Sequence, residues 1–236
     1  MPEGIKKPLQ PAILTDLGRL DYQKALDLQK KLVQGKIDGT IKEDHILLVE
    51  HPSVFTLGRR GGMENLIKDL DFLNQKKISI IQTQRGGNIT YHGPGQVVVY
   101  PVFDLKRFSI GVKDFVCKLE EIMKQTCLDV GITTNRDIKN NGLWLRNAKI
   151  GSVGLAIIHD ISMHGFALNI TVDLKPFSWI NPCGLNDICV TSIQNEYKKQ
   201  GWNTQNLSME NIKKSIATHF STLFNLTFIN AHVPIQ

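Results

Sequence analysis

One cysteine in this chain has the setting of a catalytic nucleophile. Cys183 lies between a proline and a glycine in the segment Asn181-Pro-Cys-Gly184, which indicates an accessible thiol on a well-defined backbone. A free thiol has a pKa near 8.5, so only about 3% of it is thiolate at pH 7. A nucleophilic cysteine therefore needs a basic or cationic neighbour. Taken alone, an accessible cysteine such as Cys183 is more often incidental than catalytic.

Lys149 is the candidate neighbour. It begins the segment Lys149-Ile-Gly-Ser-Val-Gly154, whose small and β-branched residues are typical of a largely buried strand. A buried lysine is costly unless it is paired or neutral. One interpretation is a base whose pKa is lowered by desolvation and which takes a proton from a substrate or a thiol. The other is a lysine that extends from a strand end into solvent.

Several further polar residues lie beside glycines. His92 and His164 are each on a predicted strand, where a histidine can support a site or can be an ordinary buried residue. Arg59, Arg60 and Arg85 could bind an anion such as a phosphate, or could pair with a neighbouring carboxylate.

A glycine-rich stretch, residues 85–101, organises the rest of the chain. Its sequence predicts a glycine loop, a short strand through Tyr91, a sharp Gly-Pro-Gly corner and a second, buried strand. A tight β-hairpin with glycines that serve only the turn is the alternative. The first glycine pair, however, precedes the corner by several residues, and polar side chains crowd the segment. These features favour a loop that faces a ligand.

Helical spacing of apolar residues occurs over residues 20–33, 109–130 and 209–224. Gly35 would end the first helix. Ser109 or Asp114 would lie near the start of the second helix, and Ser208 would cap the third. On the second helix, Cys127 belongs to the apolar stripe and is predicted to be core.

Predicted strands cover residues 46–50, 54–57, 78–82, 97–101, 142–145, 149–158, 162–170 and 226–229. Residues 9–18 read as a lead-in segment. Residues 174–192 read as a long irregular loop, which compact domains usually keep for a function. Strands in hairpin-like pairs with single helices between them indicate an α+β fold, and we expect one domain over residues 1–236.

Composition narrows the functional classes. The chain has 236 residues, 42% hydrophobic and 21% charged, as in an ordinary soluble globular protein. It carries no apolar run of membrane-spanning length, no targeting signal, no zinc-type cysteine spacing and no nucleic-acid motif. We therefore expect a cytoplasmic protein, or an organellar one if a transit peptide precedes this sequence. The net charge of +6 would attract acidic protein partners.

Five motifs in this order closely resemble the octanoyltransferase (lipoyl/octanoyl transferase, LipB-type) family. They span residues 44–195 and are His51-Pro-Ser-Val-Phe-Thr-Leu-Gly-Arg-Arg60, Arg85-Gly-Gly-Asn-Ile-Thr-Tyr-His-Gly-Pro-Gly-Gln96, Lys149-Ile-Gly-Ser-Val-Gly154, Met163-His-Gly-Phe-Ala-Leu-Asn169, and Asn181-Pro-Cys-Gly184 followed by Val190-Thr-Ser192. The second and last motifs are specific, whereas any one motif alone is weak. Asn88 departs from the longer amide, Gln, that many members carry.

The resemblance implies a biotin/lipoate protein ligase-like fold with a mixed, mainly antiparallel sheet flanked by helices. It implies octanoyl transfer from octanoyl-acyl carrier protein to a lysine of lipoyl domains, in 2-oxoacid dehydrogenases and the glycine-cleavage H protein, without metal or cofactor. Cys183 falls on the acyl-thioester cysteine and Lys149 on the lysine that activates it. His164 and Arg59 are possible supporting residues. The substrate-binding positions fall on Arg85, Gly86, Gly87, Asn88, Ile89, Thr90, Tyr91, His92, Ser152, Val153, Gly154, Gly165, Phe166 and Ala167.

Two rival activities share this fold or this chemistry. An ATP-dependent lipoate or biotin ligase would activate a free acid as an adenylate and needs no nucleophilic cysteine. A second enzyme type would use the cysteine to move octanoyl between lipoyl domains. A third rival, a non-catalytic acyl or nucleic-acid binding module, does not explain why Cys183, Lys149 and the Arg85 motif occur together.

Overall fold

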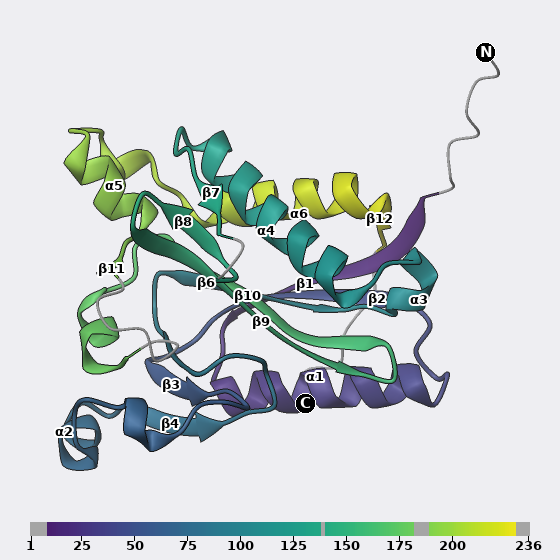
Figure 1. The fold of residues 1–236 in the computed structure, drawn as a ribbon. Helices are drawn as coiled ribbons and strands as arrows, with labels where there is room; N and C mark the ends of the chain where they lie inside the picture. The colour runs from purple at the N-terminus through teal and green to yellow at the C-terminus, as the bar shows by residue number, and fades with distance from the viewer. Residues whose placement is uncertain (1–8, 138–139, 182–188, 230–236) are drawn as a thin grey trace.

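A nine-stranded mixed sheet forms the centre of the computed structural model, which describes residues 9–137, 140–181 and 189–229 (Figure 1). The strands run in the order β12 (Leu226–Phe228), β1 (Gln10–Arg19), β2 (Asp44–Glu50), β6 (Gln96–Val102), β10 (Ile161–Asn169), β9 (Ala148–Ile158), β8 (Leu143–Leu145) and β7 (Asn135–Arg136), with β11 (Cys189–Val190) beside β9. β1 pairs in parallel with β12 and β2, as β11 does with β9, and the other pairs are antiparallel. The predicted mixed, mainly antiparallel sheet is confirmed.

Helices cover both faces of this sheet. α1 (Tyr22–Ile37) lies on one face, and α4 (Val112–Asp129) and α6 (Met209–Phe224) lie on the other (Figure 1). β6 is buried at every position because it runs through the middle of the sheet and has a helical layer on each side. Each layer has its own apolar core, with Leu26 and Val33 of α1 in one, and Phe115 and Phe220 of α4 and α6 in the other.

A second, three-stranded sheet carries the glycine-rich loop. It has the order β4 (Ser79–Gln82), β3 (Val54–Leu57) and β5 (Ile89–His92). α2 (Leu70–Gln75) and the 3-10 helices η1 (Met63–Asn65) and η2 (Lys175–Trp179) belong to the same part of the molecule. Phe55, Leu73 and Trp179 are the centre of a separate small core. The loop before β5 is therefore held between two sheets.

The first strand was not predicted. Residues 9–18, expected to be a lead-in segment, form most of β1, which pairs with β2 and supplies the buried Ala12 to the core. Buried and exposed residues alternate only weakly along β1. The pairing with β2 shifts register between Asp16 and Arg19, where Gly18 has a φ of +59°. The lead-in prediction was therefore wrong.

Two helix ends differ from the prediction. Gly35 lies inside α1 and does not end it. A Cβ at this position would lie 2.6 Å from Cδ1 of Ile41, so the glycine leaves room for the Ile41 side chain. α4 begins after Gly111, not at Ser109, whose left-handed φ of +53° ends the short helix α3 (Leu105–Phe108). α6 and its cap Ser208 agree with the prediction.

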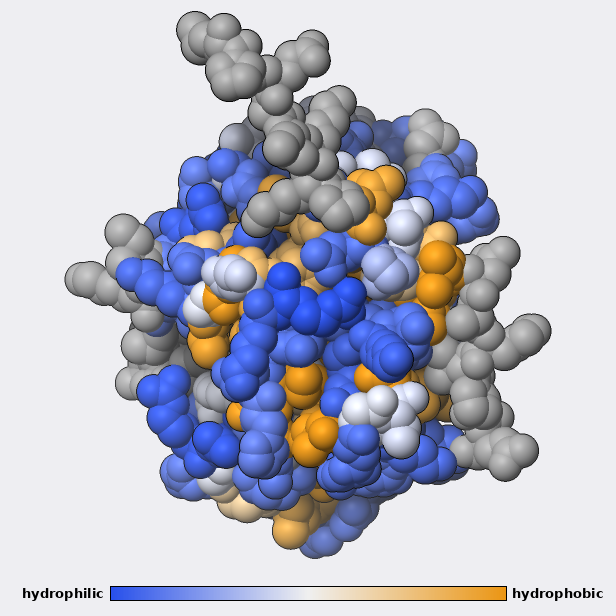
Figure 2. All heavy atoms as spheres, turned by 90° about the vertical axis from the view of Figure 1, so that its right-hand side faces the viewer, coloured by the Kyte–Doolittle hydropathy of each residue, from blue (hydrophilic) through white to orange (hydrophobic). Residues whose placement is uncertain are grey.

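The remaining short elements, α5 (Ile193–Lys199) and η4 (Thr204–Asn206), connect β11 to α6. In the part of the chain that the structure describes, no helix is long and apolar enough to span a membrane. The face on the right of Figure 1 is mostly hydrophilic, with small hydrophobic patches between charged residues (Figure 2). Cys127 is fully buried in the core, as predicted, and burial raises its pKa to about 12.

Candidate active site

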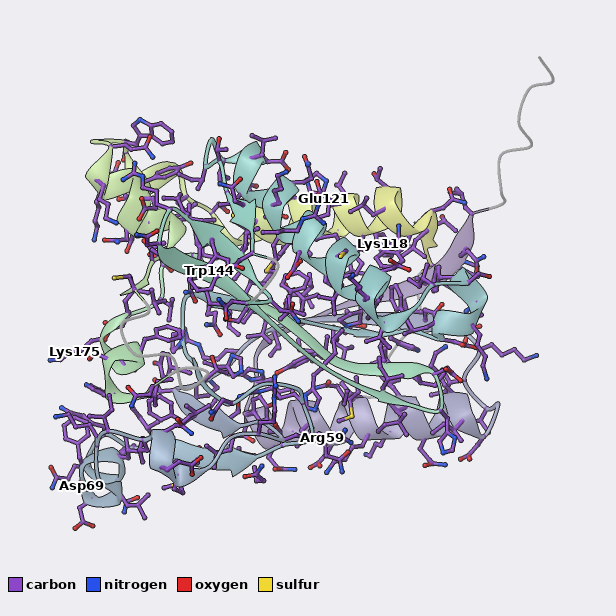
Figure 3. The ribbon with its side chains drawn as sticks, viewed as in Figure 1. Arg59, Asp69, Lys118, Glu121, Trp144 and Lys175 are labelled. Carbon is purple, nitrogen blue, oxygen red and sulfur yellow. The ribbon has the colours of Figure 1, made fainter. Side chains whose placement is uncertain are left out.

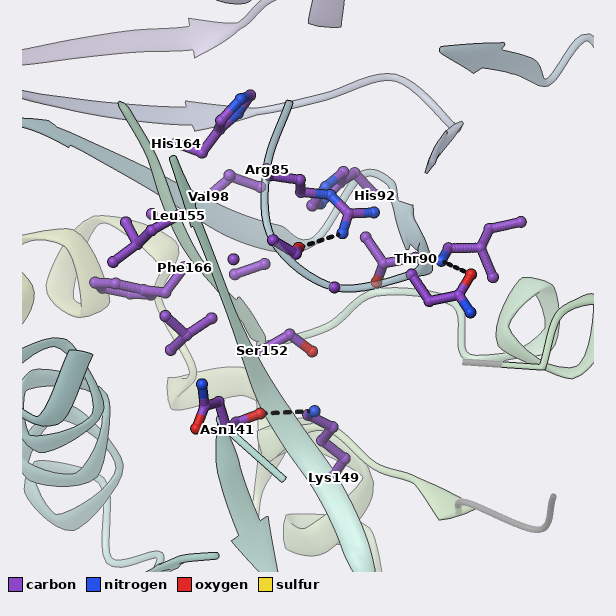
Figure 4. Close-up of a pocket in the computed structure, with 18 of the residues that line it drawn as sticks. Arg85, Thr90, His92, Val98, Asn141, Lys149, Ser152, Leu155, His164 and Phe166 are labelled. Carbon is purple, nitrogen blue, oxygen red and sulfur yellow. Dashed lines mark hydrogen bonds between the residues drawn. The ribbon is translucent and has the colours of Figure 1, made fainter. Parts of the chain in front are cut away.

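A pocket of about 600 Å³ lies where β9 and β10 of the main sheet meet the loop before β5 (Figure 4). Val98, Leu155 and Phe166 give it apolar walls. Lys149 and His164 mark two distant points of it, since Leu155, the register partner of His164, is six residues or about 20 Å along β9 from Lys149. The pocket therefore extends far enough along β9 for an acyl chain, and polar groups lie along it.

Glycines allow the loop to approach β9 closely. The backbone N–H of Gly86 donates to the carbonyl of Leu155 at 2.7 Å. A Cβ on Gly154 would lie 3.1 Å from the carbonyl oxygen of Gly86, and Gly87 has the left-handed φ of +88°. Side chains at these positions would push the loop away from the strand, so the glycines in the two motifs serve one contact.

Arg85 is the buried cation of the pocket. Its side chain is 8% exposed, and its guanidinium donates to the carbonyl and the hydroxyl of Thr56 at 2.5 and 2.8 Å and to the carbonyl of Gly86 at 3.1 Å. These bonds hold the guanidinium in place beside the two histidines of the pocket. The positive charge of Arg85 lowers the pKa of His92 and His164 in addition to the larger effect of burial.

The histidines in the pocket are neutral. Burial lowers the pKa of both His92 and His164 to about 3. His92 Nδ1 bonds to Oε1 of Gln96 at 2.7 Å. His164 is 1% exposed, and among the described residues neither of its ring nitrogens has a hydrogen-bond partner.

The backbone at His164 is strained. Its φ is +61°, unusual for a residue other than glycine, and its N–H donates to Oε1 of Gln29 on α1 at 2.9 Å. Two tyrosines line the same part of the pocket, Tyr22 and Tyr100. Burial raises the pKa of Tyr22 to about 12 and raises that of Tyr100 well above its ordinary value, so both hydroxyls are neutral too.

Lys149 lies where β9 begins. Its Nζ donates to the carbonyl of Asn141 at 2.8 Å and lies 5.1 Å from the ring centroid of Trp144. It pairs with Val190, the second residue of β11. The side chain is partly exposed and not largely buried as the strand pattern predicted, because this end of β9 borders the pocket.

The structure brings together most of the predicted substrate-binding residues. Those that line the pocket are Arg85, Gly86, Gly87, Asn88, Ile89, Thr90, His92, Ser152, Val153, Gly154, Gly165, Phe166 and Ala167. Tyr91 lies off the pocket, because its hydroxyl bonds to Ser53 at 2.9 Å and its ring packs on Phe55. Arg59 is not in the lining, whereas Arg60 is. Cys183 lies outside the described residues.

Some lining residues were missed from the sequence. Tyr22 from α1 and Val116 from α4 reach the pocket from helices that carry none of the motifs, and Tyr100 reaches it from β6, four residues beyond the end of the Arg85 motif. The sequence pattern placed Val116 on the apolar stripe of a helix, but it did not predict that Val116 lines the pocket. Among the described residues, no group of acidic, histidine or cysteine side chains could hold a metal ion.

Comparison with known proteins gives one family. The lipoyl protein ligase A/B catalytic domain matches residues 21–221. The chain is 44% identical over 187 residues to an octanoyltransferase of Desulfotalea psychrophila, covering 78% of this chain and 84% of that protein. It is 40% identical over 216 residues to an octanoyltransferase of Syntrophobacter fumaroxidans, covering 92% of each.

Solved structures share the fold at low sequence identity. Lipoate-protein ligase A bound with ATP has a TM-score of 0.70 at 12% identity, covering 96% of this chain and 89% of that chain. A bipartite lipoate protein ligase of Thermoplasma acidophilum has a TM-score of 0.68 at 14% identity, over 95% and 88% of the two chains. The predicted ligase-like fold is confirmed.

Proposed function

This chain belongs to the octanoyltransferase family of acyltransferases, and from that premise we propose that it carries out octanoyl transfer in protein lipoylation, from octanoyl-acyl carrier protein to a specific lysine of lipoyl domains. In this proposal Cys183 forms an acyl-thioester and Lys149 is the general base. The acceptors would be the lipoyl domains of 2-oxoacid dehydrogenases and the glycine-cleavage H protein, in the cytoplasm.

The observation that carries the proposal is the pocket. Its apolar walls extend from Lys149, and three sequence motifs far apart in the chain line it. Burying an octanoyl tail contributes roughly 5 kcal/mol at about 0.8 kcal/mol per methylene, which selects chain length coarsely. Cys183 precedes Val190, the register partner of Lys149, by seven residues in the sequence, which supports a meeting of thiol and amine.

The reaction would have two half-reactions. The amine of Lys149 takes the thiol proton of Cys183, and the thiolate attacks the carbonyl of the carrier-bound thioester. The carrier thiol leaves with a proton from Lys149, and an octanoyl-cysteine remains. The lysine of the lipoyl domain then attacks this thioester and passes a proton to Lys149. An amide forms as the thioester C–S bond breaks, and Cys183 leaves as a thiolate that takes the proton back from Lys149.

The transition states need stabilisation of an oxyanion. Backbone N–H groups next to the glycines of the motifs are the proposed donors. Transfer between two thioesters is nearly isoenergetic, and the amide is the stable product. A cysteine intermediate therefore costs little and lets the two protein substrates bind in turn.

Intact mass spectrometry after incubation with octanoyl-acyl carrier protein tests the proposal. An octanoyl adduct should form on the parent and on Cys127→Ser, and should be absent from Cys183→Ser. Persistence of the adduct in Cys183→Ser would place the acyl group elsewhere, for example on the exposed Cys189. A parallel assay with free octanoate and ATP identifies a ligase, and octanoyl-H protein as donor identifies transfer between lipoyl domains.

A further inference from the structure

We propose that Glu120 and Trp144 are positioning residues for Lys149: they fix the segment 140–142, against which the amino group of Lys149 is held when it has taken the thiol proton and become an ammonium. The inference rests on the proposed function, because it takes Lys149 as the partner of the Cys183 thiol. It adds a helix, α4, and a strand, β8, to the machinery that activates the nucleophile.

Within the described ranges, a backbone carbonyl and an aromatic ring contact the amino group of Lys149. The carbonyl oxygen of Asn141 accepts a hydrogen bond at 2.8 Å, and the ring of Trp144 lies with its centroid 5.1 Å away. Both a carbonyl oxygen and an aromatic face stabilise a positive charge. Trp144 is the register partner of Lys149 across β8 and β9, so sheet pairing places this ring beside the lysine.

The segment that carries the Asn141 carbonyl is anchored on both sides. The backbone N–H of Gly142 donates to Oε1 of Glu120 at 2.7 Å. The indole N–H of Trp144 donates to the carbonyl of Asn140 at 3.0 Å. Because these bonds flank Asn141, they determine where its carbonyl oxygen points and hence where Lys149 is held. Figure 4 shows the resulting hydrogen bond between Lys149 and Asn141.

The burial of the Glu120 carboxyl group costs free energy that a purely structural contact does not explain. It is 5% exposed on the core face of α4, and burial raises the pKa of its carboxyl group. The hydrogen bond from Gly142 and the charges of Arg136 and Lys149 act in the opposite direction. A buried carboxylate is usually a net cost to stability, and so a role in orienting Lys149 gives a reason for its presence.

Gly142 completes the arrangement. Its φ is +127°, and a Cβ at this position would lie 2.7 Å from Cε of Lys149 and 2.5 Å from the carbonyl oxygen of Gly151. The lysine side chain therefore runs directly against the backbone that Glu120 fixes. A cation held in this way lowers the pKa of a nearby thiol more effectively than a mobile one.

The test is the pH dependence of alkylation of Cys183 by iodoacetamide, followed by peptide mass spectrometry on the full-length protein. It reports the thiol pKa without substrate. In Lys149→Ala this pKa should rise toward the ordinary value near 8.5. Glu120→Ala and Trp144→Leu should give at least half of that rise. Glu120→Gln keeps an oxygen that can accept from Gly142 and should stay close to the parent.

Glu121→Ala is the matched control. Glu121 is the next residue of α4, and its carboxylate pairs with Arg136 at 3.5 Å at the surface, so its removal should not shift the thiol pKa (Figure 3). If Lys149→Ala shifts the pKa while Glu120→Ala and Trp144→Leu do not, the positioning role is wrong and the proposed function stands. If Lys149→Ala has no effect, the proposed base is wrong. Should Glu120→Ala fail to fold, Trp144→Leu decides.

Discussion

Two basic side chains of the pocket are held in different ways. Arg85 is buried and forms several hydrogen bonds to Thr56, which suits a planar guanidinium that keeps its charge in a dry setting. Lys149 is partly exposed, and its amino group donates to the carbonyl of Asn141 and lies against the ring of Trp144. This difference favours Arg85 as a fixed source of positive potential and Lys149 as the group that exchanges protons.

Lys149→Ala should slow acylation of Cys183 by about 100-fold or more at pH 7, because proton transfer by a positioned base contributes about that much. The rate should recover partly as the pH approaches the pKa of the free thiol near 8.5, since thiolate then forms without the base. Stopped-flow or quenched-flow acylation from octanoyl-acyl carrier protein between pH 6 and 9 measures this. An acylation rate equal to that of the parent would show that Lys149 is not the base.

At the scale of elements, the site is a contact between a loop and a strand. The loop 85–88 and β9 approach each other closely enough that Gly86 bonds to Leu155 and that a Cβ on Gly154 would lie 3.1 Å from the carbonyl oxygen of Gly86. The spacing between the two sheets at this point sets the width of the pocket. The Arg85 motif and the Lys149 motif therefore act together, because the close contact needs Gly86 from one and Gly154 from the other.

Gly154→Ala should lower kcat/KM for octanoyl transfer by roughly 10-fold with little change in thermal stability, because a Cβ 3.1 Å from the carbonyl oxygen of Gly86 displaces the loop by a few tenths of an ångström. Gly111→Ala is the control, since its Cβ would meet its nearest atom at 3.9 Å. Equal activity of the two variants would mean that the loop position does not control the pocket.

How far the sequence predicts these elements depends on their length and surroundings. α6 and its Ser208 cap were predicted correctly because its apolar stripe is long and regular. The six-residue helix α2 has a single buried residue, Leu73, and left no periodic signal. The motifs identified the loop and β9 as neighbours of a ligand. Glu120 and Trp144 could not be found, because their roles depend on a helix and a strand that meet Lys149 only in the folded chain.

At the scale of the whole molecule, burial of neutral imidazoles makes stability depend on pH. Burial lowers the pKa of His45 and His51 to about 4 and that of His92 and His164 to about 3. In the unfolded chain a histidine takes up a proton near pH 6.5, whereas these groups stay neutral in the folded protein until a much lower pH. Their contribution to stability is therefore complete above pH 6.5 and is lost as the pH falls towards 3.

His164→Asn should reduce this acid sensitivity. Asparagine does not titrate here and tolerates a positive φ such as the +61° of this residue. Between pH 7 and pH 4 the free energy of unfolding of the parent should fall by about 3 kcal/mol more than that of the variant, because pH 4 lies about 2.5 units below the unfolded-state pKa of 6.5 and still above the folded-state pKa of about 3. Urea denaturation at both pH values measures it, and parallel losses would contradict a neutral buried His164.

The net charge of +6 gives a second prediction at this scale. If acidic carrier and lipoyl domains are attracted by long-range electrostatics, raising the salt concentration from 50 to 500 mM should lower kcat/KM for octanoyl-acyl carrier protein by roughly 10-fold. Octanoyl-pantetheine, a small donor without that charge, is the control and should be nearly insensitive. Equal salt effects on the two donors would show that long-range electrostatic attraction does not speed the binding of octanoyl-acyl carrier protein.

Arg85 also joins two parts of the molecule. It is bonded to Thr56 in β3 of the small sheet, and its Cδ would be 3.3 Å from a Cβ on Gly154 in β9 of the main sheet. An acyl chain in the pocket would therefore press on the seam between the sheets. We expect slower amide hydrogen exchange in β3 and β5 once the enzyme carries the octanoyl group. Occupancy of the pocket would then change the dynamics of strands that do not contact the reacting carbonyl.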